Sequence, residues 1–119
     1  MCGRFTLTDP DPRLLRLRFG LSESAEIDQE ARYNVAPTQP IPIVRIWEGK
    51  RQFALVRWGL IPAWVKDPKT FSLLINARAD TVIDKPSFRN AMKRRRCLIP
   101  ADGFYEWRAD GAHKRPYAI

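Results

Sequence analysis

The sequence has little cysteine and almost no histidine, which limits its disulfide and metal chemistry. Cys2 and Cys97 are the only cysteines in 119 residues, and His113 is the only histidine. Two cysteines cannot build a disulfide framework, and these two lack the paired spacing of a zinc site. We therefore expect no metal site, no disulfide and a reducing, cytoplasmic environment.

Long apolar runs and a balancing number of acidic residues are missing as well. No stretch approaches the roughly 20 residues of a membrane span, and the first residues lack the apolar core of a secretory signal. We expect no membrane association and no export. The chain carries 21 Lys and Arg against 13 Asp and Glu, a net charge of +8. This surplus favours an anionic partner such as nucleic acid, although an inert basic surface has the same composition.

The residues that are present predict one packed domain of mixed structure. Four Trp, six Phe and three Tyr argue against a disordered chain. The predicted strands are 5–8, 41–47, 51–58, a buried strand from Cys97, a strand through GFYEWR and one over 115–119. The predicted helices are 11–20, capped by Asp11 and Gly20 with Leu14, Leu17 and Leu21 on one face, and 86–96, capped by Ser87. Residues 32–40 read as a loop.

These elements predict an α+β fold with a curved, mainly antiparallel sheet or barrel-like core and short flanking helices. The apolar strand that stops at Ile119 has no polar residues after it. We expect residues 1–119 to be the N-terminal part of a single, incomplete domain.

Cys2 is the first candidate for chemistry. Initiator methionine is removed when the next residue is small, which would leave an α-amine and a thiol on adjacent carbons of Cys2. Such a 1,2-aminothiol condenses with an aldehyde to a Schiff base and closes to a thiazolidine, and an N-terminal residue can supply its own base. A structural cysteine packed under the first strand is the alternative.

Several polar residues could assist a reaction at Cys2 or bind its substrate. Arg4 falls on the same strand face as Cys2 and could hold a phosphate, or could be merely solvated. Asn76 and Arg78 end an apolar run and could be site residues or caps. Asn34 could line a site or form a turn.

Aromatic residues surround a further candidate. Glu106 lies between Tyr105 and Trp107, where it could act as a general acid or base or be an ordinary surface carboxylate. Trp58 and Trp64 could stack on bases, although single tryptophans are more often core residues.

Five segments, taken in order, resemble one known family. They are MCGRF at 1–5, RYNVAPTQ at 32–39, WGLIPAW at 58–64, INARADT at 75–81 and RRCLIPADGFYEW at 95–107. In this order they are similar to the SRAP family, the SOS-response-associated peptidase-like, abasic-site-processing proteins. The resemblance covers nearly the whole chain.

The resemblance implies a function and residue roles. Family members expose an N-terminal Cys that captures abasic sites in single-stranded DNA as a thiazolidine crosslink, which protects the lesion; they also show lyase- or autopeptidase-like activity. By this likeness Cys2 is the nucleophile, Asn76 orients the aldehyde or its sugar, and Glu106 assists proton transfer. The implied DNA-binding residues are Arg4, Asn34, Arg78, Trp58, Trp64 and Pro62. The likeness implies no metal or organic cofactor, and a nucleoid-associated location in the cytoplasm.

One feature of the family is missing from this sequence. The family has a later histidine motif that works with the carboxylate at Glu106, and His113 has the wrong context to replace it. A C-terminal half or a second chain would have to supply it. The two alternative functions are an N-terminal-nucleophile cysteine peptidase, autoproteolytic in action, and a non-covalent single-stranded DNA-binding module.

Overall fold

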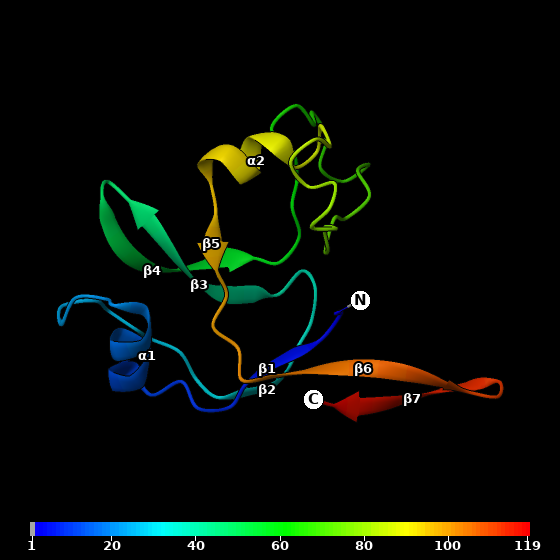
Figure 1. The fold of residues 1–119 in the computed structure, drawn as a ribbon, viewed down its shortest axis with the longest axis horizontal. Coiled ribbons are helices and arrows are strands. Elements are labelled where there is room, and N and C mark those ends of the chain that lie inside the picture. The colour runs from blue at the N-terminus through cyan, green and yellow to red at the C-terminus, as the bar shows by residue number, and fades with distance from the viewer. Residues whose placement is uncertain (1) are drawn as a thin grey trace.

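The protein is described here by a computed structural model that covers residues 2–119 and shows two antiparallel sheets and two short helices (Figure 1). In chain order the elements are β1 (Phe5–Leu7), α1 (Pro12–Phe19), β2 (Arg32–Val35), β3 (Pro40–Trp47), β4 (Lys50–Arg57), α2 (Arg89–Arg94), β5 (Cys97–Leu98), β6 (Gly103–Asp110) and β7 (His113–Ala118). Neither helix of residues 2–119 has the length and apolarity needed to cross a bilayer.

Two short segments link the two sheets, one from β2 to β3 and the other from β5 to β6. One sheet has the strand order β2-β1-β6-β7 and curls into a half-barrel, and the other has the order β4-β3-β5. β1 is an inner strand of the first sheet, because Phe5 lies opposite Val35 on one side and Phe104 on the other. The predicted α+β fold with a curved, mainly antiparallel sheet and short flanking helices is confirmed.

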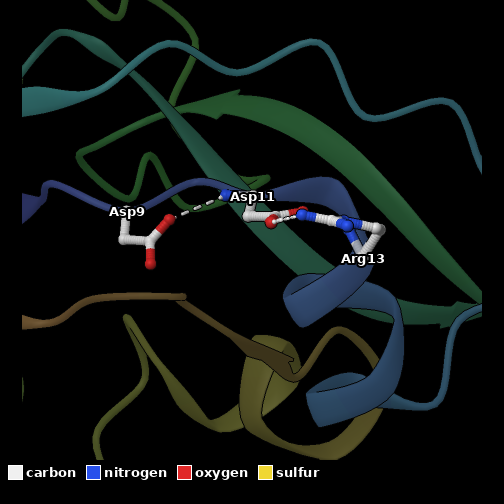
Figure 2. Close-up of polar contacts among 3 residues, drawn as sticks. All are labelled: Asp9, Asp11 and Arg13. Carbon is white, nitrogen blue, oxygen red and sulfur yellow. Dashed lines mark hydrogen bonds and ion pairs between the residues drawn. The ribbon is translucent and has the colours of Figure 1, made fainter.

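Helix α1 begins and ends where its local sequence predicts. The Asp11 carboxylate accepts a hydrogen bond from the backbone N–H of Arg13 at 2.8 Å and binds its guanidinium at 2.8 Å (Figure 2). This side-chain contact holds the pKa of Asp11 below its ordinary value. Gly20 ends the helix at φ 59°, a left-handed conformation that glycine adopts without strain.

The buried face of α1 differs from the predicted one. Leu15 is only 6% exposed and Leu21 is buried, whereas Leu17 is 83% exposed and Leu14 is exposed. The helix turns about 100° per residue, so a face centred on Leu15 excludes its neighbour Leu14. The prediction of a Leu14, Leu17 and Leu21 face is wrong except for Leu21.

Three further predictions about local structure are wrong. Residues 32–35 form β2 rather than a loop, because pairing with β1 outweighs the turn chemistry of the sequence. Helix α2 starts at Arg89 after Phe88, and its N-cap position makes no side-chain hydrogen bond, so Ser87 does not cap it. The strand predicted to be buried from Cys97 is β5, which has only two residues, both exposed. It pairs with β3 on one side and is an edge strand of its sheet.

The core lies between the two sheets and reaches the N-terminal segment. Phe5 and Val35 from the first sheet pack with Ile41 and Ile43 from the second. Burying a side chain of this size stabilises the fold by about 1.5–3 kcal/mol. Partly buried residues packed against this cluster are Cys2, Ala54, Val56 and Trp58. Cys2 is therefore at the edge of the core rather than on a loose terminus.

Candidate active site

A pocket of about 580 Å³ opens beside Cys2. Its walls are mainly apolar, and they are contributed by segments far apart in the sequence. The lining residues are Cys2, Phe5, Trp58, Ile75, Asn76, Ile99, Ala101, Asp102, Gly103, Phe104 and Ile119. The pocket thus brings together three of the residues singled out from the sequence: Cys2, Asn76 and Trp58.

The side chain of Asn76 is tied directly to Cys2. The Asn76 amide nitrogen donates a hydrogen bond to the carbonyl oxygen of Cys2 at 2.8 Å. The Cys2 thiol donates to the carbonyl oxygen of Arg4 at 3.4 Å, and that same carbonyl accepts from the backbone N–H of Tyr105 at 3.0 Å. These bonds hold the segment before β1 beside β6, with the sulfur half-buried in the pocket wall.

Trp58 positions the segment that carries Asn76. Its indole nitrogen donates to the carbonyl oxygen of Ile75 at 3.0 Å, and its ring packs on Phe5 with centroids 5.4 Å apart. The backbone N–H of Leu60 donates to the carbonyl oxygen of Leu74 at 2.8 Å. Residues 74–76 are therefore fixed against the core although they belong to no helix or strand.

Arg4 and Glu106 lie next to the pocket without lining it. The Nε atom of Arg4 is buried, and it has no hydrogen-bond partner among residues 2–119. An unsatisfied buried donor is costly, so this guanidinium favours an added acceptor. Glu106 is half-buried on β6, on the same strand face as the pocket residue Phe104.

Arg78 is held by a neighbouring carboxylate. Its guanidinium donates to both oxygens of Asp80, at 3.1 and 2.8 Å. This contact raises the pKa of Arg78 and lowers that of Asp80. Both groups are exposed, so a phosphate could compete with Asp80 for the guanidinium.

The other predicted DNA-binding residues lie apart from the pocket lining. Asn34 is exposed on β2, and β2 is joined to β6 by a hydrogen bond from the Tyr105 hydroxyl to the carbonyl oxygen of Tyr33. Pro62 is buried. Trp64 is 60% exposed and meets Phe71 edge-on, with ring centroids 5.6 Å apart. Of the WGLIPAW segment, Trp64 therefore offers the aromatic surface.

Asp102 is a pocket residue that the sequence analysis missed. Its two carboxylate oxygens accept four hydrogen bonds of 2.5 to 3.1 Å, from the Thr6 hydroxyl, the Thr8 N–H and hydroxyl, and the Asp9 N–H. Burial opposes the charged form, but these hydrogen bonds outweigh it and lower the pKa of Asp102 to about 2. The donors lie more than 90 residues earlier in the chain. The sequence around Asp102 therefore contains no pattern that predicts these hydrogen bonds.

The Asp102 contacts predict a pH-dependent contribution to stability. The folded-state pKa lies below the unfolded value of about 3.9, so the carboxylate stabilises the fold above that value and loses the effect as pH falls toward 2. Allowing for solvent screening, we expect Asp102→Asn to lower the free energy of unfolding by about 1 kcal/mol at pH 7. Urea titrations of both proteins from pH 7 to pH 2 should show this difference shrinking below about pH 4. Asp28 is an exposed carboxylate and provides the control, Asp28→Asn. An equal loss of stability there would contradict the role of the Asp102 hydrogen bonds.

Gly103 lets β6 approach β1 at the pocket. A Cβ atom at this position would lie 2.8 Å from the Thr6 hydroxyl oxygen and 3.1 Å from the carbonyl oxygen of Ile119. A larger residue would require the Thr6 side chain to move and would press on the backbone of Ile119. No set of three or more His, Cys, Asp or Glu residues within 2–119 is placed to hold a metal ion.

Comparison with known proteins places this fold in a family. Residues 1–119 match the family described as SOS response associated peptidase (SRAP). Abasic site processing protein YoqW of Bacillus subtilis (strain 168) is 43% identical over 121 residues, which cover all of this chain and 54% of that protein. Abasic site processing protein HMCES of Gallus gallus is 34% identical over 140 residues, which cover all of this chain and 42% of that protein.

Solved structures agree with the sequence comparison. A crystal structure of a protein from Bacteroides thetaiotaomicron superimposes with a TM-score of 0.77 at 30% identity, over 98% of this chain and 53% of that one. A phage-related protein from Bordetella bronchiseptica gives a TM-score of 0.71 at 29% identity, over 98% of this chain and 54% of that one. The chain spans about half the length of the curated relatives and solved structures that it matches. The match over all its residues and the shared fold show that the chain belongs to the SRAP family.

Proposed function

We propose that this chain processes abasic sites in single-stranded DNA and that Cys2 forms a covalent bond to the lesion. The observation that carries the proposal is the hydrogen bond from Asn76 to the Cys2 carbonyl within the 580 Å³ pocket. It fixes the backbone of the reactive residue beside a cavity large enough for a sugar. Relatives named as abasic site processing proteins support the choice of substrate.

The proposed reaction needs no cofactor. After removal of Met1, the Cys2 α-amine attacks the ring-opened aldehyde and releases one water to give an imine. The thiol sulfur then adds to the imine carbon, and the thiol proton moves to the nitrogen. The product is a five-membered thiazolidine, one water lighter than the separate protein and DNA. A charged Asp102 in the same pocket wall would favour the cationic imine that precedes ring closure.

The surrounding residues are given supporting roles in this proposal. Asn76 orients the aldehyde or its sugar, and Glu106 transfers protons during imine formation. Arg4 and Arg78 bind phosphates, and the exposed guanidinium of Arg78 supports its role. The exposed Trp64 ring lies against a base, and Trp58 and Pro62 support the segment behind it. The exposed Asn34 on β2 contacts the DNA outside the pocket lining.

The test is intact mass spectrometry of the protein after incubation with single-stranded DNA that contains one abasic site. We expect a species equal to protein without Met1 plus DNA minus one water, and none with undamaged DNA. Mass spectrometry of the protein alone first checks that Met1 has been removed. If Met1 is absent and no adduct forms with the abasic DNA, covalent capture by this chain is ruled out.

The requirement for the Cys2 α-amine distinguishes this proposal from the peptidase alternative. A thiol-only mechanism survives when the amine is blocked, whereas thiazolidine formation does not. A protein that keeps a residue before Cys2 has an amide nitrogen in place of the α-amine, so it should form no adduct, whereas thiol-dependent cleavage should be unaffected.

A further polypeptide segment is also part of the proposal. Apolar residues around the pocket and on the adjoining hairpin remain exposed: Ile99, Phe104, Trp107, Tyr117 and Ile119. Relatives of about twice this length have further sequence that could cover such a surface. We expect a C-terminal half or a second chain to complete the domain and to contribute to proton transfer with Glu106.

A further inference from the structure

The connection between β2 and β3 is one of the two links between the sheets, and it contains a strained turn (Figure 1). The backbone N–H of Gln39 donates to the carbonyl oxygen of Ala36 at 3.3 Å and closes the turn. Pro37 is its second residue, and Thr38 is its third, with φ 74°. This is the pattern of a type II turn, whose third position needs a positive φ and is usually glycine. A β-branched residue is strained there, so other contacts must hold the turn.

The side chains of Arg32 and Gln39 supply those contacts. The Gln39 side-chain oxygen accepts a hydrogen bond from the Arg32 guanidinium at 2.6 Å and another from the backbone N–H of Ala36 at 3.0 Å. Because both partners are donors, the atom that meets them must be the amide oxygen and not the amide nitrogen. Arg32 also donates to the carbonyl oxygen of Pro40. This pair, which we call the Arg32–Gln39 clamp, therefore bonds to the backbone on both sides of Thr38.

The turn held by the clamp is bonded to the backbone of Trp58. The N–H of Thr38 donates to the carbonyl oxygen of Trp58 at 2.8 Å, and the N–H of Trp58 donates to the carbonyl oxygen of Gln39 at 3.0 Å. These two bonds lie just beyond the last pair of the β3–β4 ladder, Pro40 and Arg57. The position of Trp58 therefore depends on the conformation of the turn.

From Trp58 the hydrogen bonds lead to the reactive residue. The Trp58 indole donates to the carbonyl oxygen of Ile75, and the next residue, Asn76, donates to the carbonyl oxygen of Cys2. The clamp is also joined to the N-terminal segment directly, because Arg32 is on β2, and β2 pairs with β1. Cys2 is thus held from two sides by contacts that both begin at Arg32. Reacting groups keep a productive geometry only when the residues behind them are fixed in this way.

We propose that Arg32 and Gln39 are positioning residues for the reaction at Cys2. Neither residue lines the Cys2 pocket, so they act through Trp58 and the segment that carries Asn76. Without the clamp the turn can relax toward a conformation with a negative φ, and Trp58 moves with it. A displacement of this kind lowers the rate of the reaction at Cys2 and leaves DNA affinity nearly unchanged. This rests on the proposed function for the identity of that reaction.

The test changes only the acceptor of the clamp. Gln39→Met keeps the length of the side chain but removes the oxygen, whereas Gln39→Glu keeps an oxygen that can accept from both donors. Gln52→Met is the matched control, because Gln52 accepts a hydrogen bond from Arg45 at 3.0 Å and lies outside the lining of the Cys2 pocket. The control therefore removes an arginine–glutamine bond of the same type elsewhere in the fold.

The rate of covalent capture is measured at several concentrations of excess abasic single-stranded DNA, at a temperature where circular dichroism shows each protein to be folded. Gln39→Met should lower the maximal rate about tenfold and change the half-saturating DNA concentration less than about twofold. Gln39→Glu and Gln52→Met should react at the parent rate. A lower final yield of adduct with an unchanged rate would indicate a purely structural role and overturn the proposal, as would an equal slowing in Gln52→Met.

Hydrogen exchange of the Trp58 indole N–H, followed by NMR and assigned with Trp58→Phe, tests the clamp without any reaction. Exchange should be about tenfold faster in Gln39→Met than in the parent or in Gln52→Met, and unchanged exchange would overturn the proposal. If Gln39→Met does not fold, Arg32→Lys should show the same slower capture and faster exchange, since lysine lacks the planar fork that bonds to Gln39 and Pro40. A parent that forms no adduct would reject the proposed function, whereas faster indole exchange would still support control of Trp58 by the clamp.

Discussion

Cys2→Ser should still bind abasic DNA but should form no adduct that survives heating in detergent. Serine keeps the α-amine and can form the imine, but its hydroxyl is a much weaker nucleophile than a thiol and closes the ring poorly. Denaturing gels of protein mixed with abasic single-stranded DNA should therefore show a crosslinked band for the parent and none for Cys2→Ser. Adding borohydride during the reaction should restore the band for the variant by reducing the imine.

Cys97→Ser is the matched control for this result. Cys97 is the other cysteine of the chain. It is an exposed residue, but partial desolvation of its sulfur raises the pKa of its thiol, which lowers its nucleophilic fraction at neutral pH. The Cys97→Ser protein should crosslink as the parent does. A heat-stable band in Cys2→Ser without borohydride, or its loss in Cys97→Ser, would contradict the assignment of Cys2.

Trp58→Ala should cause the largest loss of stability among the predicted site residues. The substitution removes the ring that packs on Phe5 and the hydrogen bond to the carbonyl oxygen of Ile75. Large-to-small changes of buried aromatics cost about 3–5 kcal/mol; for this half-buried ring we expect about 2–3 kcal/mol in the free energy of unfolding. Urea denaturation followed by circular dichroism measures it.

Two other tryptophan variants separate packing from hydrogen bonding. Trp58→Phe keeps an aromatic ring on Phe5 but loses the donor, and should cost about 1–2 kcal/mol. Trp64→Ala changes an exposed ring and should cost less than about 1 kcal/mol, while weakening DNA binding under the proposed function. Equal losses of stability at positions 58 and 64 would show that Trp58 does not anchor the segment that carries Asn76.

Local chemistry explains which parts of the fold could be predicted from the sequence. Helix α1 is defined by an aspartate cap, a proline at its first position and a glycine in a left-handed conformation, all within ten residues. The β3–β4 hairpin likewise needs only two β-rich runs and Gly49 between them. Each of these elements carries its own signal.

The elements that were missed depend on distant partners. Strand β2 has the composition of a loop and becomes a strand only by pairing with β1. The hydrogen bonds of Asp102 reach residues more than 90 positions away, and Asn76 meets Cys2 across 74 positions. No local pattern records such contacts. Only the family resemblance links Cys2, Asn76 and Glu106 at the level of the sequence.

The position of β1 within its sheet has a consequence during synthesis. β1 is made first, but its partner β6 follows about 100 residues later, which takes roughly 5–20 s at the ribosome. Throughout that interval the first residues cannot complete their sheet, and an aminopeptidase can reach Met1 on the nascent chain. The late arrival of β6 thus leaves time for the Cys2 amine to be exposed before the sheet closes over the residues that follow it.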